Sequence, residues 1–269
     1  MHTSIRFDWN IEEFDLLLDC CHRDDGVRLA LQYLPKDQPI LEAGCGTGRV
    51  VKFMHDLGYI IEGIELNEEI VQQVKQLYPE LRLFSGDILN IPRNDHSYGG
   101  IISFGVVEHF PEGLQRPLAE LYRVLKPGGI AIITVPSLNR VRQIKYVLEK
   151  YLSCLHPRKN NMIRKLFGKK QLQRNTHGFK FYVFPQFGKF FEYRLTPREF
   201  ERECMKAHFN ILHSIPISHI DGLYHEFGTM FCQFRNWKFY PNRAGKFLNT
   251  VLTRIAFFHN HMHALILTK

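Results

Sequence analysis

Short apolar runs alternate with amphipathic stretches from Pro39 onward, a pattern typical of a parallel sheet whose two faces are covered by helices. Runs of consecutive apolar residues predict buried strands, and apolar residues at helical spacing predict the helices between them. The predicted strands are Ile40–Ala43, Ile60–Glu65, Leu81–Ser85, Tyr98–Phe104 and Gly129–Val135. The predicted helices are Gly48–Leu57, Glu68–Leu77 and Gln115–Leu125, the last of which ends in a turn-forming cluster, Lys126-Pro127-Gly128-Gly129.

A helical region is predicted before this alternation, because apolar residues occur at helical spacing and continue through Val27–Leu34 into the first strand. These residues are Ile11, Phe14, Leu17 and Leu18. After Pro136 the alternation stops until Thr196, which is too long for an ordinary connection in a compact domain. We therefore interpret this stretch as an insertion with a role of its own.

Regular order resumes at Thr196-Pro197-Arg198-Glu199, which is a capping box with proline at the first helical position and predicts a helix to about Ala207. A strand over Phe209–Ile217 follows, then a second irregular stretch over Ser218–Phe258 and a final strand over His261–Thr268.

We thus expect an α/β protein with a Rossmann-like seven-stranded sheet, helices on both faces and a lid built from two insertions. The expected organisation is a core with N-terminal helices (residues 1–137), a first insertion (138–195), a core continuation (196–218), a second insertion (219–258) and a final core strand (259–269).

The first predicted strand runs into a glycine-rich loop, Gly44-Cys45-Gly46-Thr47-Gly48, and then directly into a predicted helix. Glycines allow a sharp turn and a close approach of a ligand, and the helix N-terminus offers unpaired N–H groups. This pattern indicates a nucleotide-like ligand at the carboxyl end of a sheet. The dinucleotide fingerprint would need its third glycine where this chain has Arg49, so the spacing disfavours a nicotinamide cofactor.

Two acids follow at matching positions of the next two strands. Glu65 closes the second predicted strand and can accept hydrogen bonds from two ribose hydroxyls. Asp87 comes just after the third strand and can accept from the exocyclic amine of adenine. Together with the loop, they predict a pocket for an adenosine without a pyrophosphate.

At these residues the sequence resembles the class I S-adenosylmethionine-dependent methyltransferases, over about Pro39–Pro136 and again in the last two strands. The segment Leu121–Gly129 is also similar to the turn into strand five of the small-molecule members. The resemblance implies that S-adenosyl-L-methionine is the cofactor, with the motif Glu42–Gly48 beneath its methionine half, Glu65 at the ribose and Asp87 at adenine. The cofactor-binding residues it implies are Glu42, Gly44, Cys45, Gly46, Glu65, Leu66, Asp87, Ile88, Phe104 and His109.

Residues that orient the methyl acceptor are expected just past the fourth predicted strand, in Ser103–Phe110. Phe104 is placed to flank the adenine or to line the pocket. His109 is the candidate catalytic residue, because a histidine titrates near neutrality and can act as a general base or hydrogen-bond the acceptor. The alternative is that His109 caps or packs the start of the next segment.

A metal site is not expected here. Some quinone-precursor O-methyltransferases that resemble this stretch carry an additional acid three residues before the Glu108-His109 pair, and this chain has Gly105 there. The Asn-Pro-Pro-Tyr signature of nucleic-acid amino methyltransferases is also absent, since Ser103–Val106 stands in its place. This counts against methylation of bases in DNA or RNA.

Three histidines alternate near the end of the chain, at His259, His261 and His263. On a strand they would share one face, and a metal site is conceivable, yet no carboxylate or cysteine nearby completes one. We expect an exposed face of an edge strand. In the second insertion, Asp221, Tyr224, His225 and Glu226 could either reach a substrate or form a loop surface.

The net charge of +8 is concentrated in the first insertion, whose segment Leu138–Leu195 has 14 Lys and Arg against two acids, Glu149 and Glu192. Its aromatic half, Phe179–Tyr193, is expected to close as a lid over the acceptor side. The cationic cluster of this insertion is either a solvated face or a contact with an anionic membrane surface, and nucleic acid is an unlikely partner. The cluster is Arg158, Lys159, Arg164, Lys165, Lys169 and Lys170.

Six cysteines without paired spacing, and no apolar signal sequence, favour a reducing cytoplasm. No apolar run approaches the length of a membrane-spanning helix. The sequence therefore predicts a methyltransferase that uses S-adenosyl-L-methionine and acts on oxygen or nitrogen of a small or lipid-like acceptor. The alternatives are a non-catalytic protein that binds this cofactor or S-adenosylhomocysteine and docks a partner through its basic segment, and a nicotinamide-dependent oxidoreductase.

Overall fold

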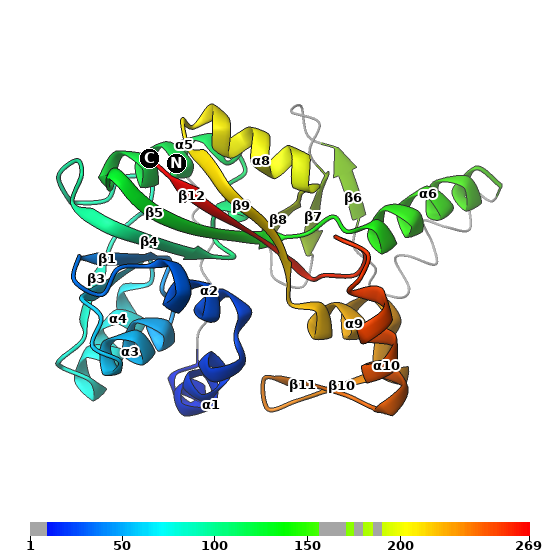
Figure 1. Ribbon diagram of the computed structural model, residues 1–269, viewed down its shortest axis with the longest axis horizontal. Helices are drawn as coiled ribbons and strands as arrows, with labels where there is room; N and C mark the ends of the chain where they lie inside the picture. Colours follow the sequence, from blue (N-terminus) through cyan, green and yellow to red (C-terminus); the bar gives the residue numbers. More distant parts are fainter. Residues whose placement is uncertain (1–9, 156–170, 175–179, 185–189) are drawn as a thin grey trace.

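The computed structural model of the chain describes residues 10–155, 171–174, 180–184 and 190–269. Its centre is a seven-stranded sheet in the order β3-β2-β1-β4-β5-β12-β9 (Figure 1). The first five strands along the chain are parallel to one another, and β12 runs antiparallel to both β5 and β9. The strands are β1 (Ile40–Ala43), β2 (Ile61–Glu65), β3 (Arg82–Ser85), β4 (Tyr98–Phe104), β5 (Leu125–Pro136), β9 (Asn210–Ile217) and β12 (Met262–Thr268).

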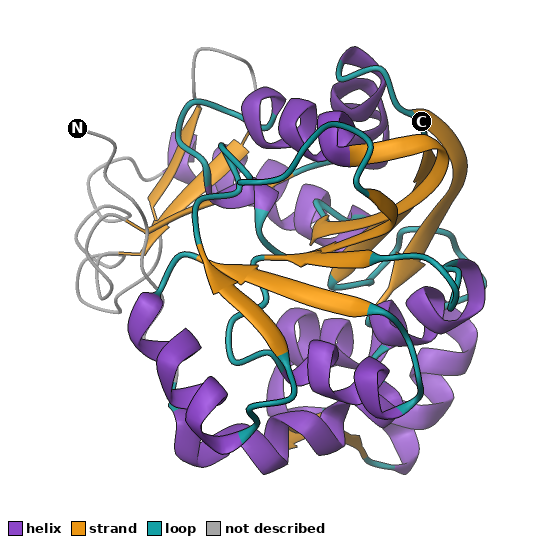
Figure 2. Ribbon diagram, turned by 90° about the vertical axis from the view of Figure 1, so that its left-hand side faces the viewer, coloured by secondary structure: helices purple, strands orange, loops and turns teal. Residues whose placement is uncertain are grey.

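Helices cover both faces of this sheet, as Figure 2 shows from the side. One face packs against α2 (Asp25–Tyr33), α3 (Arg49–Asp56) and α4 (Glu68–Leu77), and the other against α5 (Gln115–Val124) and α8 (Pro197–Lys206). The two apolar clusters that result explain why β1 is buried along its whole length, since a parallel sheet covered on both faces needs apolar residues on both. The predicted fold is confirmed.

The capping box at Thr196 is confirmed, because the Thr196 hydroxyl oxygen accepts from the Glu199 N–H at 3.3 Å and the Glu199 carboxylate accepts from the Thr196 backbone N–H at 2.8 Å. The predicted turn at Lys126–Gly129 is wrong. These residues belong to β5, whose pairing with β4 shifts register after Leu125, and Gly128 takes a positive φ of 73° within that irregular stretch. A bulged strand uses the same glycines as a turn.

The N-terminal helices contact the start of α3 beside the glycine-rich loop. They consist of α1 (Phe14–Cys20) and α2, with short 3-10 turns at Ile11–Glu13 and Cys21–Arg23. The side chain of Asp24 caps α2 by accepting from the Gly26 N–H at 2.9 Å, and its other oxygen pairs with Arg49 at 2.8 Å. One carboxylate thus starts α2 and fixes it to α3.

The first insertion contains regular structure, contrary to the sequence interpretation. It begins with α6 (Arg140–Leu155) and includes a three-stranded antiparallel sheet of β6 (Gln171–Arg174), β7 (Lys180–Phe184) and β8 (Phe190–Arg194). The cationic cluster Arg158–Lys170 lies outside the described residues. At the end of the aromatic half, Tyr193 is buried and its hydroxyl donates to the Pro111 carbonyl oxygen at 2.8 Å, which anchors β8 beside the loop after β4.

The second insertion is also regular, so the prediction of an irregular stretch is wrong. It folds as α9 (His219–Phe227), a 3-10 turn (Gly228–Met230), a hairpin of β10 (Cys232–Arg235) and β11 (Lys238–Pro241), and α10 (Arg243–Leu252). Asn236 and Trp237 connect the two strands with positive φ angles of 49° and 59°, as a two-residue hairpin turn requires.

The three alternating histidines do not form the face of an edge strand. Strand β12 lies between β5 and β9 and begins only at Met262. His263 is buried in it, with Nε2 2.9 Å from the Ser214 hydroxyl, and burial lowers its pKa to about 3. His259 is buried beside α10, and His261 stacks on His225 with ring centroids 4.1 Å apart. Over the described residues, no group of side chains is arranged to hold a metal ion.

Two further expectations concern the whole chain. No helix in the part of the chain that the structure describes combines the length and the apolar character needed to cross a bilayer. The cysteines within that part, Cys20, Cys21, Cys45, Cys204 and Cys232, are free thiols.

Candidate active site

The glycine-rich loop leaves β1 at the carboxyl edge of the sheet and is held to the neighbouring strand. Gly44, Gly46 and Gly48 all have positive φ angles, of 81°, 53° and 73°, which L side chains rarely adopt. The N–H groups of Gly44 and Cys45 both donate to the carbonyl oxygen of Ile64, at 2.9 and 3.0 Å. These hydrogen bonds hold the turn against β2, so the loop lies at the carboxyl edge of the sheet.

The carboxylate of Glu65, at the end of β2, faces this loop. One oxygen accepts from the Gly46 N–H at 2.9 Å and the other from the Asn67 N–H at 3.0 Å. A carboxylate offers about four acceptor positions, so about two remain for hydroxyl groups of a ligand. The structure therefore brings Glu65 and Gly46 together, as the sequence predicted.

Asp87 lies at the end of the adjacent strand. The Gly86 N–H donates to the Glu65 carbonyl oxygen at 2.9 Å, so the two acidic residues occupy neighbouring strand ends. One oxygen of Asp87 accepts from the Leu89 N–H at 2.8 Å, which fixes the loop and leaves the second oxygen for a donor. Of the two hydrophobic candidates beside these acids, Leu66 is exposed and Ile88 is buried in the core.

Two other candidates turn into the fold. Glu42 is buried on the α3 side, where it accepts from the Val51 N–H, and burial raises its pKa to about 8 despite the opposing effect of Arg49. The thiol of Cys45 packs against Gly63, since a Cβ at that glycine would lie 2.7 Å from the sulfur. Their side chains thus support the loop, and backbone groups are what Cys45 presents to a ligand.

Gly44 also has a packing role that the sequence did not reveal. A Cβ on Gly44 would lie 2.6 Å from a methyl carbon of Val106, so this glycine lets the segment after β4 approach the loop. Phe104, at the end of β4, places its ring 3.1 Å from the Cβ position of Gly26 in α2. The ring is half-buried and forms part of the wall between the N-terminal helices and the loop.

His109 and Glu108 lie in the 3-10 turn (Val107–His109) that follows β4. The Nε2 of His109 is 3.7 Å from a carboxyl oxygen of Glu108, and the imidazole is largely buried. Glu108 is 1% exposed, and its second oxygen has no hydrogen-bond partner. Burial raises the pKa of Glu108 well above its usual range.

Glu108 entered the sequence analysis only as part of a missing metal site, and its burial could not be seen there. The Cβ position of Gly105 is 3.4 Å from a Glu108 oxygen, so position 105 does lie beside the acid. Glycine at this position leaves the site without a second carboxylate.

The sequence analysis also missed a buried charge cluster behind this edge. Arg142 in α6 pairs with Glu226 in α9 at 2.5 Å and lies 2.7 Å from Nδ1 of His261, and Lys145 pairs with the other Glu226 oxygen at 3.0 Å. On β8, Arg194 pairs with Glu192 at 2.7 Å. The cations of the first insertion that the sequence counted as one charged run therefore include several with specific acidic partners.

The polar set of the second insertion divides along α9. Glu226 belongs to the buried charge cluster, and Tyr224 and His225 pack in an aromatic group with Phe239. Asp221 faces the start of α2, and burial followed by repulsion from Asp24 and Asp25 raises its pKa to about 7. All four residues belong to α9, so the alternative of a loop surface is wrong.

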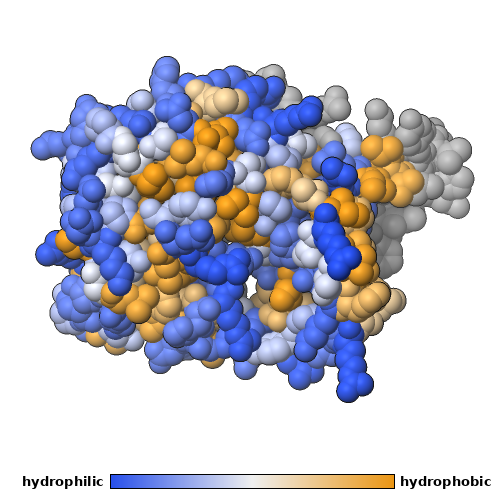
Figure 3. All heavy atoms as spheres, viewed as in Figure 1, coloured by the Kyte–Doolittle hydropathy of each residue, from blue (hydrophilic) through white to orange (hydrophobic). Residues whose placement is uncertain are grey.

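The surface is hollowed between the N-terminal helices and the second insertion (Figure 3). Two contacts join these parts: the Ser218 N–H donates to Asp25 at 2.8 Å, and Lys238 forms an ion pair with Asp19. The second insertion therefore contacts the same N-terminal helices that lie beside the glycine-rich loop.

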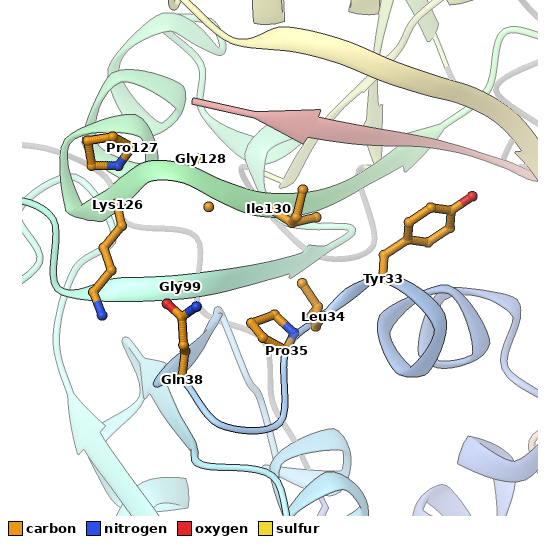
Figure 4. A pocket seen from close by; sticks show the side chains of 10 residues that line it. Tyr33, Leu34, Pro35, Gln38, Gly99, Lys126, Pro127, Gly128 and Ile130 are labelled. Carbon is orange, nitrogen blue, oxygen red and sulfur yellow. The ribbon is translucent and has the colours of Figure 1, made fainter.

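A separate pocket of about 310 Å³ lies at the opposite edge of the sheet (Figure 4). It is lined by residues before or at the starts of strands, among them Gln38, Gly99 and Lys126. Ligands of open α/β sheets bind at the carboxyl ends of the strands, so this pocket is not the candidate site.

The sheet order, with one antiparallel strand beside β5, and the acids beside a glycine-rich loop define a Rossmann-like methyltransferase fold. Residues 41–133 match the family model described as a methyltransferase domain. The chain is similar to a solved S-adenosylmethionine-dependent methyltransferase from Mesorhizobium loti, with a TM-score of 0.56 and 11% identity over 93% of this chain and all of the other. This likeness concerns the fold.

Three curated relatives share the core. The chain is 32% identical over 114 residues to a probable S-adenosylmethionine-dependent methyltransferase of Mycolicibacterium smegmatis, which is 42% of each chain. It is 32% identical to a malonyl-[acyl-carrier protein] O-methyltransferase of Pectobacterium atrosepticum over 45% of this chain and 49% of the other. It is 28% identical to a demethylmenaquinone methyltransferase of Chlorobaculum tepidum over 48% of this chain and 54% of the other.

The matched region spans about half the length of these relatives or less. Residues 41–133 match a methyltransferase domain, and the chain has the fold of the class I methyltransferases, a group whose cofactor is S-adenosyl-L-methionine. The donor set at the carboxyl edge fits this cofactor, because two carboxylates with spare acceptor positions flank a turn of positive φ.

Proposed function

We propose that the protein transfers the methyl group of S-adenosyl-L-methionine to an oxygen or nitrogen of a small or lipid-like acceptor. The observation that carries this proposal is the position of Glu65, whose carboxylate bridges Gly46 of the glycine-rich loop and Asn67 while Asp87 occupies the next strand end. Two carboxylates beside a glycine-rich turn suit an adenosine, and they lie within the residues that match the methyltransferase domain.

Glu65 would hold the ribose hydroxyls and Asp87 the adenine amine, each through acceptor positions that the fold does not use. The backbone of Gly44, Cys45 and Gly46 would lie along the methionine half. The bound cofactor supplies a methyl group on a positively charged sulfur, which is already an activated leaving group. The protein therefore has to orient the acceptor and, where necessary, remove its proton.

His109 is the proposed base or hydrogen-bonding residue for the acceptor, and Glu108 is the group that positions it. Glu108 lies directly beside the imidazole, and its burial favours the uncharged form of its carboxyl group. Tyr193 brings β8 against the loop after β4. This contact supports the proposal that the aromatic half of the first insertion covers the acceptor side.

The acceptor class is supported by two relatives, whose names give a malonyl thioester carrier and a quinone precursor as substrates. Both are acceptors methylated outside nucleic acids. Contact of the Arg158–Lys170 cluster with an anionic membrane surface stays a prediction, because these residues lie outside the described ones.

The test is turnover with methyl-labelled S-adenosyl-L-methionine and a metabolite and lipid extract, followed by S-adenosylhomocysteine formation and label in the extract. We expect label in a small or lipid fraction, and loss of that label in a His109→Asn variant. Tight cofactor binding without S-adenosylhomocysteine formation would favour the non-catalytic, partner-docking alternative. Label in nucleic acid would contradict the acceptor class.

A further inference from the structure

An apolar stripe runs along the outer side of α10 in the second insertion. Phe247, Val251 and Ile255 follow one another at four-residue spacing, so they share one face of the helix and of the turn that continues it. Their side chains are 73%, 41% and 41% exposed. Such residues normally face the core of a protein, and here they face away from it.

The helix itself makes its closest contact with the protein at a different point. Its buried residue is Gly245, where a Cβ would lie 2.1 Å from the Phe231 carbonyl oxygen. A glycine lets α10 lie directly on the start of the hairpin, while the stripe points outward. In Figure 3, apolar side chains lie over the right-hand part of the molecule, where Figure 1 places α6 and α10.

A second exposed apolar stripe adjoins the first. The N–H groups of Arg140 and Val141, at the start of α6, donate to the carbonyl oxygens of Phe257 and Phe258 just beyond the α10 stripe. Along α6, apolar residues again have helical spacing and half-exposed side chains. They are Ile144, Val147 and Leu148.

Charge along α10 itself has one sign, whereas Lys238 in the hairpin is paired with Asp19 of α1. Residues 228–258 contain five Lys and Arg and no Asp or Glu. Three of these cations alternate with the stripe, since Arg243 and Lys246 precede Phe247 and Arg254 precedes Ile255. The cations are Arg235, Lys238, Arg243, Lys246 and Arg254.

We propose that the α10 surface, defined as Phe247, Val251 and Ile255 with Arg243, Lys246 and Arg254, docks the protein on an anionic lipid surface. Apolar side chains of an interfacial helix enter the boundary between headgroups and acyl chains, while flanking cations reach the phosphates. The uniform positive charge matches a continuous anionic plane. In a two-fold contact between copies of this chain, the same cations would face one another and repel.

This surface contains none of the residues proposed to bind cofactor or acceptor, so the inference is independent of methyl transfer. It also differs from the Arg158–Lys170 cluster, which the sequence alone suggested as a membrane contact.

The experiment is co-sedimentation of the purified full chain with vesicles of phosphatidylglycerol and phosphatidylcholine, compared with vesicles of phosphatidylcholine alone. We expect salt-sensitive binding to the anionic vesicles. In a Phe247→Ser, Val251→Ser, Ile255→Ser variant, the affinity for these vesicles should fall by about ten-fold or more. An Arg243→Gln, Lys246→Gln, Arg254→Gln variant should lose about a hundred-fold at low salt and respond less to added salt.

Matched controls remove the same numbers of exposed groups elsewhere. Leu57→Ser, Leu77→Ser, Leu212→Ser removes three leucines of comparable exposure, and Lys75→Gln, Arg82→Gln, Arg198→Gln removes three exposed cations. Both control variants should bind vesicles as the parent does. Because every changed side chain is exposed, circular dichroism should show an unchanged fold for all four variants.

A fluorescence reporter tests insertion directly. The chain has two tryptophans, Trp9 and Trp237, so Phe247→Trp in a Trp9→Phe, Trp237→Phe background places the only indole on the stripe. Its emission should shift to the blue on adding anionic vesicles. The proposal is overturned if the parent does not bind these vesicles, if the stripe variant binds as well as the parent, or if the stripe instead mediates self-association.

Discussion

The guanidinium of Arg142 and the carboxylate of Glu226 form a buried ion pair, 2.5 Å apart, with side chains that are 5% and 3% exposed. Arg142 lies in α6 at the start of the first insertion and Glu226 in α9 of the second, so this pair joins the two insertions through the protein interior. Burial alone would raise the pKa of Glu226, but Arg142 and Lys145 together lower it. Both groups are therefore charged at neutral pH.

Breaking this pair should strongly destabilise the protein. In an Arg142→Met variant, Glu226 keeps Lys145 but loses its buried partner, and we expect a loss of about 3 to 5 kcal/mol in the free energy of unfolding, measured with urea. The control is Asp56→Asn, which breaks the exposed pair with Lys52 and should cost about 1 kcal/mol or less. Equal effects of the two substitutions would show that the insertions do not depend on the pair.

Cofactor binding should depend on the charge of Glu65. In Glu65→Gln, an amide NH2 group replaces one carboxylate oxygen, so the hydrogen bonds to Gly46 or Asn67 and to a ribose hydroxyl weaken. The loss should be about 1.5 to 3 kcal/mol in total, or about ten- to a hundred-fold in cofactor affinity. Calorimetric titration with S-adenosyl-L-methionine measures this change. Glu68→Gln, at an exposed position three residues further on, should leave the affinity as it is.

His109→Asn should lower turnover far more than cofactor affinity, because the imidazole follows β4, where we propose that the acceptor binds. A general base contributes about a hundred- to ten-thousand-fold to the rate. His208→Asn is a suitable control, since His208 is exposed and has a positive φ that asparagine tolerates. Unchanged turnover would leave His109 as a packing residue, and a loss limited to cofactor binding would move it to the other half of the site.

The buried carboxyl of Glu42 should make stability fall with rising pH. Its pKa is raised from an ordinary 4.5 to about 8 by burial, so the folded protein holds this proton more tightly than the unfolded chain. The corresponding stabilisation is present below pH 4.5 and is lost as the pH rises through about 8. Urea midpoints of the parent and of Glu42→Gln should therefore diverge toward alkaline pH in favour of the variant. A constant difference across this range would contradict the assignment.

Local sequence patterns predicted the core well because its central strands, β1 and β4, are buried on both faces. Continuous apolar runs followed by helical spacing placed β1, β4 and α4 at their observed bounds. Pairing partners were beyond reach: Lys126–Gly129 has the composition of a turn, and only its register with β4 makes it a bulged strand.

The second insertion escaped prediction for a different reason. The apolar face of α10 points outward, so its helical spacing does not contribute to a core, and Gly222 and Gly245 interrupt both helices of the insertion with residues of low helical propensity. Gly222 is nonetheless required, because a Cβ there would lie 1.7 Å from the His259 carbonyl oxygen. Such close approaches are set by tertiary packing.

The roles of Glu65, Asp87 and the glycine-rich loop toward a ligand stay predictions. Residue type and spacing were sufficient to place these residues at neighbouring strand ends. They were insufficient for Glu108, whose chemistry depends on burial, and for Arg142 with Glu226, which are 84 residues apart in sequence. The alternating histidines failed as a pattern because the strand begins only after the first two of them.

A structure of the protein in complex with S-adenosylhomocysteine would show whether the cofactor binds at the carboxyl edge of the sheet, beside Glu65 and Asp87. We expect the adenosine at this edge, with its ribose hydroxyls bound to Glu65 and its adenine amine bound to Asp87. The homocysteine should lie along Gly44–Gly46. The sulfur should then face the side of His109. A ligand bound at the opposite edge, in the pocket near Gln38 and Lys126, or a glycine-rich loop that makes no contact with it, would contradict the account.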